Sequence, residues 1–315
     1  MSERVAVKPS ILECIGSTSL VELRSIVPRS GARILLKIES ENPTGSMKDR
    51  MALAMIEGAE RDGKLKPGQL VVEYTGGSTG VSLALVCAAK KYPLHIVSSD
   101  AFSKQKLDHM RALGAELTII KSIDGGMSAA LVHEMSEAAR KISESTGAFQ
   151  TDQFKNRDQP LAYHKMADEI LEQTGGKVDA FVQSVGTSGS IRGNAERFHA
   201  KNPKTQIIAV EPSESAVLSG KPTGSHKIEG IGAGFVAPLW DPNLVNAIEM
   251  VSTDEAKSMA RRLAREEAIM GGTSTGCNLV AALRVAERLT AGATVVTVMC
   301  DAGMKYLSTD LYAIS

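Results

Sequence analysis

The amino-acid sequence predicts an α/β fold with mostly parallel sheets, on the strength of two observations. Short apolar runs of strand length alternate with segments in which apolar residues recur at helical spacing. The connections between successive strands are long enough to hold a helix, which favours parallel pairing through right-handed β–α–β units. With 315 residues, the chain can bury a large core and is expected to form one or two domains.

The expected elements follow one another in this alternating order. Strands are expected where aliphatic residues cluster, at residues 34–38, 70–74, 94–97, 117–120, 180–184, 207–210 and 294–299. Helices are expected at residues 47–61, 79–91, 103–113, 191–199 and 277–289. Residues 146–160 are polar and interrupt the alternation, so a domain boundary is expected near Thr151.

Composition and charge favour a protein that acts on a small molecule. Lys plus Arg and Asp plus Glu each number 36, and no basic stripe or acidic tail is present, which argues against nucleic acid or a membrane surface as partner. The first eight residues lack the apolar core of a signal peptide. The cysteines (Cys14, Cys87, Cys277 and Cys300) lie far apart, and Cys87 and Cys300 are expected in the core. A reducing cytoplasm is the expected location.

The first of three glycine- and hydroxyl-rich loops is Thr75, Gly76, Gly77, Ser78, Thr79 and Gly80, between an expected strand and helix. Glycines let backbone N–H groups approach an anion, and the start of a helix adds positive potential. One alternative is a tight turn without a ligand. Another is a dinucleotide site with Asp100 as the ribose-binding acid, although the glycine spacing is not that of the dinucleotide motif.

The second loop is Gly186, Thr187, Ser188, Gly189 and Ser190. Its backbone amides and hydroxyls, together with the dipole of the helix that follows, suit a phosphate dianion. Because serine and glycine also begin helices without binding anything, the plain helix start remains an alternative. The third loop, residues 271–276, includes Ser274, and its hydroxyls could simply cap a helix.

Lys48 lies in the segment 42–50, where a loop turns into a helix. A lysine is unfavourable at a helix N-terminus, which hints at a role other than a solvated partner of Asp49. In a cleft, desolvation would favour its neutral, nucleophilic form. One amine together with several anion-binding loops is what a chain needs to hold pyridoxal phosphate as an imine. Histidines and cysteines show no metal-ligand spacing, so no metal site is expected.

Taken together, these segments resemble the cysteine synthase (O-acetylserine sulfhydrylase) and cystathionine β-synthase family of pyridoxal phosphate enzymes. The matching segments are residues 11–21, 42–50, 75–80, 153–154, 186–190, 228–235, 272–276 and 306–309. They occur in the family's order and span nearly the whole chain, which makes the set far more specific than any one loop.

The resemblance implies a tryptophan-synthase-β-like fold, in which two three-layer α/β domains with mostly parallel sheets enclose the cofactor in a cleft. Residues 45–151 would form the smaller, substrate-binding domain. Residues 1–44 and 152–315 would form the larger, cofactor-binding domain. Family members are usually homodimers, and by analogy serine acetyltransferase is a candidate partner beside the amino-acid substrate.

The resemblance also implies roles for single residues. Lys48 would form the imine and act as the general base. The cofactor would be bound by Lys48, Ser78, Gly186, Thr187, Ser188, Gly189, Ser190 and Ser274, with Ser274 at the pyridine nitrogen. The substrate would be bound by Thr75, Gly76, Gly77, Thr79, Gln153 and Gly232.

The first loop departs from the family pattern at two positions. The family's loop usually reads Thr-Ser-Gly-Asn-Thr-Gly, so Gly76 replaces a serine and Ser78 replaces an asparagine. Two outcomes are open: the change weakens the loop and leaves a slow cysteine synthase, or the space accommodates a larger or different amino acid, with Ser78 in contact with it. We favour the second, because the other motifs stay near the family pattern.

The predicted activity is β-replacement on an amino acid through an aminoacrylate, and the favoured form is cysteine synthesis from O-acetylserine and sulfide. Two other enzymatic outcomes remain open. One is β-elimination, as in serine or threonine dehydratases and cysteine desulfhydrases, and the other is cystathionine formation. A third alternative is a protein with this fold but no catalysis.

Overall fold

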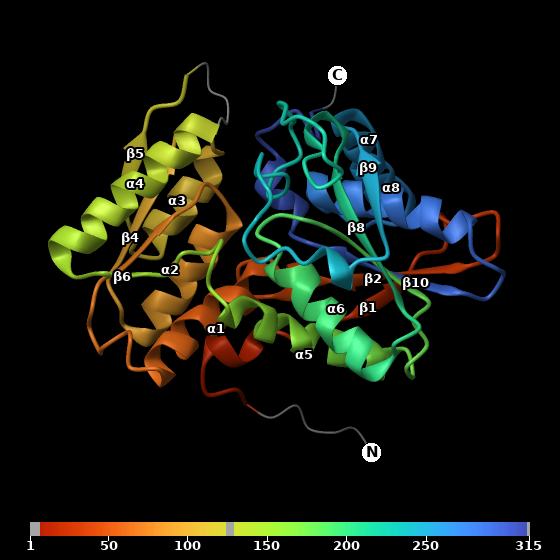
Figure 1. The fold of residues 1–315 in the computed structure, drawn as a ribbon, viewed down its shortest axis with the longest axis horizontal. Helices are drawn as coiled ribbons and strands as arrows, with labels where there is room; N and C mark the ends of the chain where they lie inside the picture. Colours follow the sequence, from red (N-terminus) through yellow and green to blue (C-terminus); the bar gives the residue numbers. More distant parts are fainter. Residues whose placement is uncertain (1–6, 124–128, 314–315) are drawn as a thin grey trace.

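The computed structural model describes residues 7–123 and 129–313, and it has the α/β fold that the sequence predicts. Two sheets lie side by side, each with helices packed on it (Figure 1). Most of the segment 1–8, on which the expectation about a signal peptide rests, lies outside the described residues. Within the described ranges, no helix combines the length and apolar character needed to cross a membrane.

The larger sheet draws its strands from both ends of the chain. It holds β1 (Leu20–Glu22), β2 (Arg33–Ile38), β7 (Ala180–Ser184), β8 (Gln206–Pro212), β9 (Ala247–Val251) and β10 (Thr294–Met299), in the order β1-β2-β10-β7-β8-β9. All neighbouring strands pair in parallel except β1 with β2. The helices of this part are α5 (Asp158–Gln173), α6 (Gly189–Lys201), α7 (Thr253–Glu266) and α8 (Thr273–Glu287).

The smaller sheet is formed by a continuous part of the chain. Its strands are β3 (Val71–Tyr74), β4 (Leu94–Ser99), β5 (Glu116–Ile120) and β6 (Phe149–Gln150), in the order β5-β4-β3-β6, and all pair in parallel. Around it lie α1 (Lys48–Arg61), α2 (Ser78–Lys90), α3 (Lys104–Ala112) and α4 (Ala129–Thr146). Helix α1 packs against both α2 and α5, so it stands between the two sheets (Figure 1).

The expected strands and helices are all present, with ends shifted by one or a few residues. The polar segment 146–160 is less irregular than expected, because it contains the short strand β6 and the start of α5. The proposed division into residues 45–151 and the remainder stays a prediction. It agrees with the strand order, since β6 closes the smaller sheet just before Thr151.

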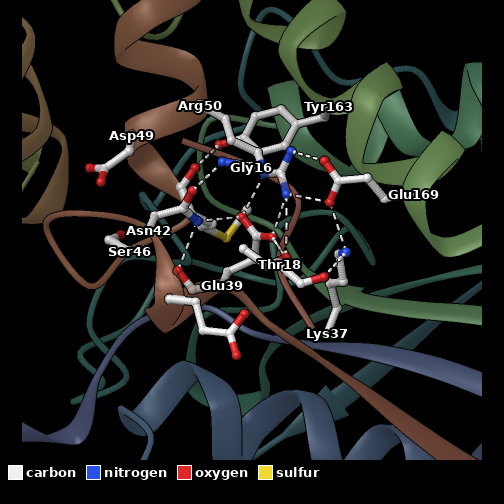
Figure 2. Close-up of polar contacts among 12 residues, drawn as sticks. Gly16, Thr18, Lys37, Glu39, Asn42, Ser46, Asp49, Arg50, Tyr163 and Glu169 are labelled. Atoms are coloured by element: carbon white, nitrogen blue, oxygen red, sulfur yellow. Dashed lines mark hydrogen bonds and ion pairs between the residues drawn. The ribbon is translucent and has the colours of Figure 1, made fainter. Parts of the chain in front are cut away.

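A buried ion-pair network fixes the start of α1 (Figure 2). Arg50 Nε lies 2.7 Å from Glu39 Oε2, and Arg50 Nη2 lies 2.8 Å from Glu169 Oε2. Lys37 Nζ lies 2.7 Å from the same Glu169 oxygen. Burial acts to raise the pKa of the Glu169 carboxyl, but Arg50 and Lys37 outweigh it and lower this pKa to about 2. The Glu169 carboxylate therefore stays charged over the whole physiological range.

A second buried acidic group, the carboxyl of Glu73, joins β3 to the chain that follows β6. Glu73, on β3, is fully buried and accepts hydrogen bonds from Thr151 Oγ1 at 2.5 Å and from the Gln153 N–H at 3.0 Å. Burial raises its pKa to about 7, although these hydrogen bonds act in the opposite direction. Glu73 therefore positions the chain after β6 and holds a proton up to near-neutral pH.

Replacement of Arg50 should be strongly destabilising. In Arg50→Ala, the buried Glu39 carboxylate loses its cation, so the free energy of unfolding should fall by about 3–5 kcal/mol in urea titrations. The matched control is Arg33→Ala, which breaks the pair with Glu22 at 2.8 Å, where the side chains are 50% and 44% exposed. That loss should be at most about 1 kcal/mol. Equal losses would show that the buried network does not stabilise this region.

The raised pKa of Glu73 predicts a specific pH dependence of stability. The folded protein keeps the Glu73 proton up to about pH 7, whereas the unfolded chain releases it near its ordinary pKa of 4.5. The free energy of unfolding should therefore fall, by up to about 3 kcal/mol, as the pH rises from about 4.5 to about 7. Glu73→Gln carries no titrating group, and its stability should lack this fall. Parallel curves for the two proteins between pH 4 and pH 8 would contradict the assignment.

Candidate active site

Lys48 is the first residue of α1, and the end of β10 holds it in place. The Met47 N–H donates to the Cys300 carbonyl at 2.9 Å, and the Tyr163 hydroxyl donates to the Met47 carbonyl at 3.2 Å. Burial lowers the pKa of Lys48, while Cys300 and Asp301 act to raise it. The balance favours a neutral, nucleophilic amine at a lower pH than for a solvated lysine.

Asp301, which follows β10, is a site residue that the sequence analysis missed. Its Oδ2 accepts hydrogen bonds from Tyr306 Oη at 2.8 Å and from Ser78 Oγ at 3.3 Å. Nearby Lys305 has a buried Nζ without a hydrogen-bond partner among the described residues, and burial lowers its pKa. Asp301 thus connects the Lys48 side of the site to the first turn of α2. No local motif marks it, because a lone aspartate after a strand has many roles.

The predicted phosphate loop forms the turn between β7 and α6. Ser188, the residue before α6, has a left-handed backbone with φ of 70°, and its buried Oγ finds no partner in the described part of the chain. A Cβ on Gly186 would lie 2.5 Å from the Gly230 carbonyl oxygen, so only glycine fits there. Thr187 Oγ1 and Ser190 Oγ are already bonded, to Gln159 and Gln183 respectively.

Four helices begin at the predicted ligand loops after a residue whose own side chain makes no capping hydrogen bond, although Ser46 Oγ accepts from the Lys48 N–H at 3.2 Å at the start of α1. The residues before α1, α2, α6 and α8 are Met47, Gly77, Ser188 and Gly272, and within the described ranges none of them makes a capping hydrogen bond through its side chain. The residues before α3 and α5, Ser103 and Arg157, also make no capping side-chain bond, whereas helix α7 has a complete capping box formed by Ser252 and Glu255. Uncapped helix starts carry free N–H groups and positive potential, which suit anionic groups. The residues present therefore fit a phosphate-bearing cofactor.

The predicted substrate residues from two distant segments lie in contact. Thr79 Oγ1 donates to Gln153 Oε1 at 2.9 Å, and Gln153 Nε2 donates to the Tyr74 carbonyl at 3.1 Å. Gln159, on α5, donates to the Gln153 carbonyl and accepts from Thr187 Oγ1 at 2.9 Å. Gln159 was not predicted, and it joins the substrate loop to the phosphate loop.

The two altered positions of the substrate loop have visible partners. A Cβ on Gly76 would lie 1.7–1.9 Å from carbons of the Phe102 ring, so the space beside Gly76 is already filled. The sequence analysis favoured a space that accommodates a larger amino acid, but the Phe102 ring fills it. Ser78 points to Asp301. Gly77 has open space beside it.

Gly232 contacts the start of the phosphate loop, and Ser274 contacts the residue that follows β10. The Gly232 N–H donates to the Val185 carbonyl at 3.0 Å, which places the segment 228–235 against the phosphate loop. Ser274, in the first turn of α8, is buried and hydrogen-bonds the Cys300 thiol. Burial raises the pKa of this thiol to about 11, so it stays neutral. Cys300 lies in the core, as expected, and also beside Lys48.

The dinucleotide alternative loses its support. Asp100 accepts hydrogen bonds from the Ser122 N–H and hydroxyl, both at 2.8 Å, and pairs with Lys121. The carboxylate is therefore engaged with the chain after β5. Across residues 7–123 and 129–313, no group of His, Cys, Asp and Glu side chains is arranged to hold a metal ion.

Comparison with known proteins agrees with this geometry. Residues 11–301 match the family model described as pyridoxal-phosphate dependent enzyme. A cysteine synthase from Staphylococcus aureus is 41% identical over 313 residues, which cover 98% of this chain and 99% of that protein.

Solved structures extend the similarity to three dimensions. A cysteine synthase from Entamoeba histolytica is 40% identical with a TM-score of 0.93, and the match covers 100% of this chain and 94% of that one. An O-acetylserine dependent cystathionine β-synthase from Helicobacter pylori is 32% identical with a TM-score of 0.91, over 98% and 100% of the two chains. The chain therefore belongs to the family of pyridoxal-phosphate dependent enzymes that includes the cysteine synthases.

Proposed function

We propose that this protein catalyses β-replacement on an amino acid, in the manner of a cysteine synthase, converting O-acetylserine and sulfide into cysteine and acetate. The observation that carries the proposal is the position of Lys48. Its amine has a lowered pKa and sits at the start of α1, where the end of β10 and the first turn of α2 meet through Asp301. The relatives named cysteine synthase support the same reaction.

The residues around Lys48 would hold pyridoxal phosphate at both ends. Lys48 would carry the cofactor covalently. The free amides and the unpartnered Ser188 hydroxyl at the start of α6 would bind its phosphate. Ser274 would face the pyridine nitrogen, and Ser78 would lie on the opposite side, near Asp301.

The substrate carboxylate would be bound by the loop that begins α2. Thr79 and Gln153 are joined by a hydrogen bond at 2.9 Å, and the helix that begins after Gly77 has no side-chain cap. Gly76 would contribute its backbone N–H and Thr75 its hydroxyl, because the Thr75 N–H already donates to the Val97 carbonyl at 2.9 Å. Gly232 would form the rim on the side of the larger sheet.

The chemistry depends on one base and on neutral groups near the ring nitrogen. Pyridoxal phosphate, when bound, withdraws electrons from the amino acid and makes its α-proton acidic. The Lys48 Nζ, with its lowered pKa, would accept this proton and return one at the end. Ser274 and the neutral Cys300 thiol do not supply the negative charge that stabilises a protonated pyridine. This arrangement favours expulsion of a β-substituent over transamination.

Elimination and cystathionine formation share this machinery up to the loss of the leaving group. A relative named for cystathionine synthesis, at 32% identity, makes the second of these a specific alternative. By analogy with the family we also propose a homodimer in the cytoplasm, with serine acetyltransferase as a candidate partner. Sedimentation velocity of the purified protein tests the dimer.

Product analysis tests the proposed reaction. The protein loaded with pyridoxal phosphate is incubated with O-acetylserine and isotopically labelled sulfide, and the products are identified by mass spectrometry. The proposal predicts cysteine that carries the label, together with acetate in equal amount. Pyruvate and ammonia without labelled cysteine would establish elimination instead, and recovery of unchanged O-acetylserine would support a non-catalytic protein.

The cofactor should be attached to Lys48 and not to the neighbouring buried lysine. Reduction of the loaded protein with borohydride, followed by peptide mapping, should place the pyridoxyl group on Lys48, because its amine is buried near Cys300 and Asp301 and has a lowered pKa. Lys48→Ala should lose the label while remaining folded. The matched control is Lys305→Ala, which should keep the label on Lys48. A label on Lys305 in the native protein would contradict the assignment.

The hydroxyl of Ser188 should contribute to cofactor binding. In Ser188→Ala, loss of one hydrogen bond to a charged phosphate should weaken the affinity for pyridoxal phosphate about ten- to a hundredfold, measured by fluorescence titration. Ser98→Ala provides the control, since Ser98 Oγ on β4 is also buried without a partner among the described residues. Equal effects of the two changes would mean that the phosphate lies elsewhere.

A further inference from the structure

Gln153 lies in a sharp turn of the chain that follows β6. The residue before it, Asp152, has a left-handed backbone with φ of 46°, which is uncommon for a residue other than glycine. Such a conformation persists where neighbouring contacts hold it, and it is frequent at ligand sites. In this turn the contacts come from one carboxyl group, that of Glu73 on β3.

Glu73 binds the turn on both sides of Asp152. Its Oε2 accepts hydrogen bonds from Thr151 Oγ1 at 2.5 Å and from the Gln153 N–H at 3.0 Å, and its Oε1 accepts from the Tyr74 N–H at 2.9 Å. The carboxyl group is thus the acceptor at each contact. A distance of 2.5 Å between two oxygens is typical of a hydroxyl that donates to a carboxylate. The surroundings of Glu73 are therefore arranged for its ionised form.

The turn places the Gln153 side chain at the start of α2. Its Oε1 accepts from Thr79 Oγ1 at 2.9 Å, and its Nε2 donates one proton to the Tyr74 carbonyl at 3.1 Å. An amide nitrogen carries two protons, and the described part of the chain offers the second one no acceptor. This proton is therefore available to an anionic group at the helix start, where Ser78 contacts Asp301.

We propose that Glu73 is a positioning residue for the amino-acid substrate, which acts through Gln153 and raises the affinity for the substrate carboxylate when Glu73 is ionised. The inference rests on the proposed binding of this carboxylate at the start of α2, and it adds a regulation of that site by pH. Glu73 acts indirectly, since its hydrogen bond goes to the Gln153 backbone and the available proton is on the Gln153 side chain.

Ionisation of Glu73 changes the strength of its hydrogen bonds. Burial raises its pKa to about 7, so the carboxyl group carries a proton below that pH and loses it above. A protonated carboxyl group must donate its proton, and Thr151 Oγ1, at 2.5 Å, is within reach to accept it. The Gln153 N–H then meets a neutral group, and such a hydrogen bond is weaker than one to a carboxylate. The turn is therefore held more firmly above about pH 7.

Two titratable neighbours of Glu73 belong to the same turn and strand. The Asp152 carboxylate acts with burial to raise the pKa of Glu73, and it pairs with Lys155 at 3.3 Å. Burial and the charge of Glu73 raise the pKa of Tyr74 to about 12, so the tyrosine stays neutral. The ionisation near pH 7 is therefore that of Glu73.

The other charged groups on the described elements packed against β3 are paired or lie on its opposite face. His95 on β4 lies beside Val72, whose side chain points away from the face of Glu73, and α4 packs on that same opposite face. Lys90, at the end of α2, pairs with Glu60 at 2.8 Å. Strand β6 consists of an aromatic residue and an amide. The charge of Glu73 thus depends on its burial and on its own turn.

Kinetics of the loaded enzyme as a function of pH test the role of Glu73. Both kcat and KM for O-acetylserine are measured in the native protein and in Glu73→Gln, which keeps the size of the side chain and cannot ionise. At about pH 5.5 the two KM values should agree, because both groups are then neutral. At about pH 8.5 the KM of Glu73→Gln should be about five- to tenfold higher with kcat unchanged, which is the difference between a hydrogen bond to a charged and to a neutral group. A ratio of KM values that stays constant with pH, or a loss confined to kcat, would overturn the proposal.

Glu211, on β8, provides the matched control. It is also buried, and it accepts from the Leu218 N–H at 2.8 Å and from the N–H and hydroxyl of Ser219 at 3.0 Å and 2.6 Å. Its three donors belong to the chain after β8 and not to the turn of Gln153. Glu211→Gln should leave KM unchanged at both pH values. The same rise of KM in Glu211→Gln would mean that any buried carboxylate has this effect, and it would contradict the proposal.

A double-mutant cycle tests whether Glu73 acts through Gln153. Gln153→Ala should raise KM by itself, and Glu73→Gln in that background should add little, because the side chain that Glu73 positions is gone. Additive effects on KM would refute this route. If Glu73→Gln does not fold, Thr151→Val removes the hydroxyl bound to Glu73 and should raise KM, whereas Thr151→Ser keeps it and should not. Equal KM values for these two variants would also refute the proposal.

Binding of alanine separates this inference from the proposed function. Alanine carries the same carboxylate without a leaving group, and its dissociation constant is measured from the change in cofactor absorbance of the loaded protein. A native protein that does not turn over O-acetylserine with sulfide refutes β-replacement, and the alanine constants then decide the role of Glu73. Equal constants for the native protein and Glu73→Gln at about pH 8.5 refute that role alone.

Discussion

The ion pairs of Arg50 with Glu39 and Glu169 are the constraint on which the rest of the structure depends. Arg50 is on α1, Glu39 follows β2 and Glu169 is on α5, so one guanidinium joins three elements that are distant in sequence (Figure 2). Burying these charges is unfavourable unless each keeps its partners in good geometry. The start of α1 therefore has little freedom, and Lys48, two residues before Arg50, is held against the end of β10.

The candidate site follows from where the two sheets end. Parallel strands bring their carboxyl ends to one edge, and open α/β sheets bind ligands in the crevice at that edge. Here the ends of β3, β7 and β10 supply the substrate loop, the phosphate loop and Asp301. Hydrogen bonds through Gln153 and Gln159 join the two loops, so binding at one loop can influence the other. Helix starts without caps leave free N–H groups at this place, and the capped start of α7 lies elsewhere in the chain.

The local pattern of the sequence predicts the frame and the motif residues, because both depend on short stretches. Aliphatic runs identify the central strands, and the loops around Lys48 and Ser188 carry their chemistry in consecutive residues. The strand β6 was missed because its two residues lie in a polar segment. They become a strand by pairing with β3, which is distant in the sequence.

The local sequence pattern does not predict the tertiary contacts that complete the site. Asp301 meets Ser78 across more than 200 residues, and Phe102 meets Gly76 only because β3 and β4 are neighbours in the sheet. The sequence alone therefore shows that Gly76 departs from the family pattern. The reason a glycine is needed there, a ring that fills the adjacent space, depends on tertiary structure.

Hydrogen exchange on addition of pyridoxal phosphate tests the central claim most directly, namely that uncapped helix starts around Lys48 bind the anionic cofactor. The account predicts that amide exchange slows together in the peptides that cover residues 186–191 and 273–276, at the starts of α6 and α8. Exchange at residues 252–255, at the capped start of α7, should not change. Slower exchange at only one of the two uncapped starts, or an equal effect at α7, would contradict the account.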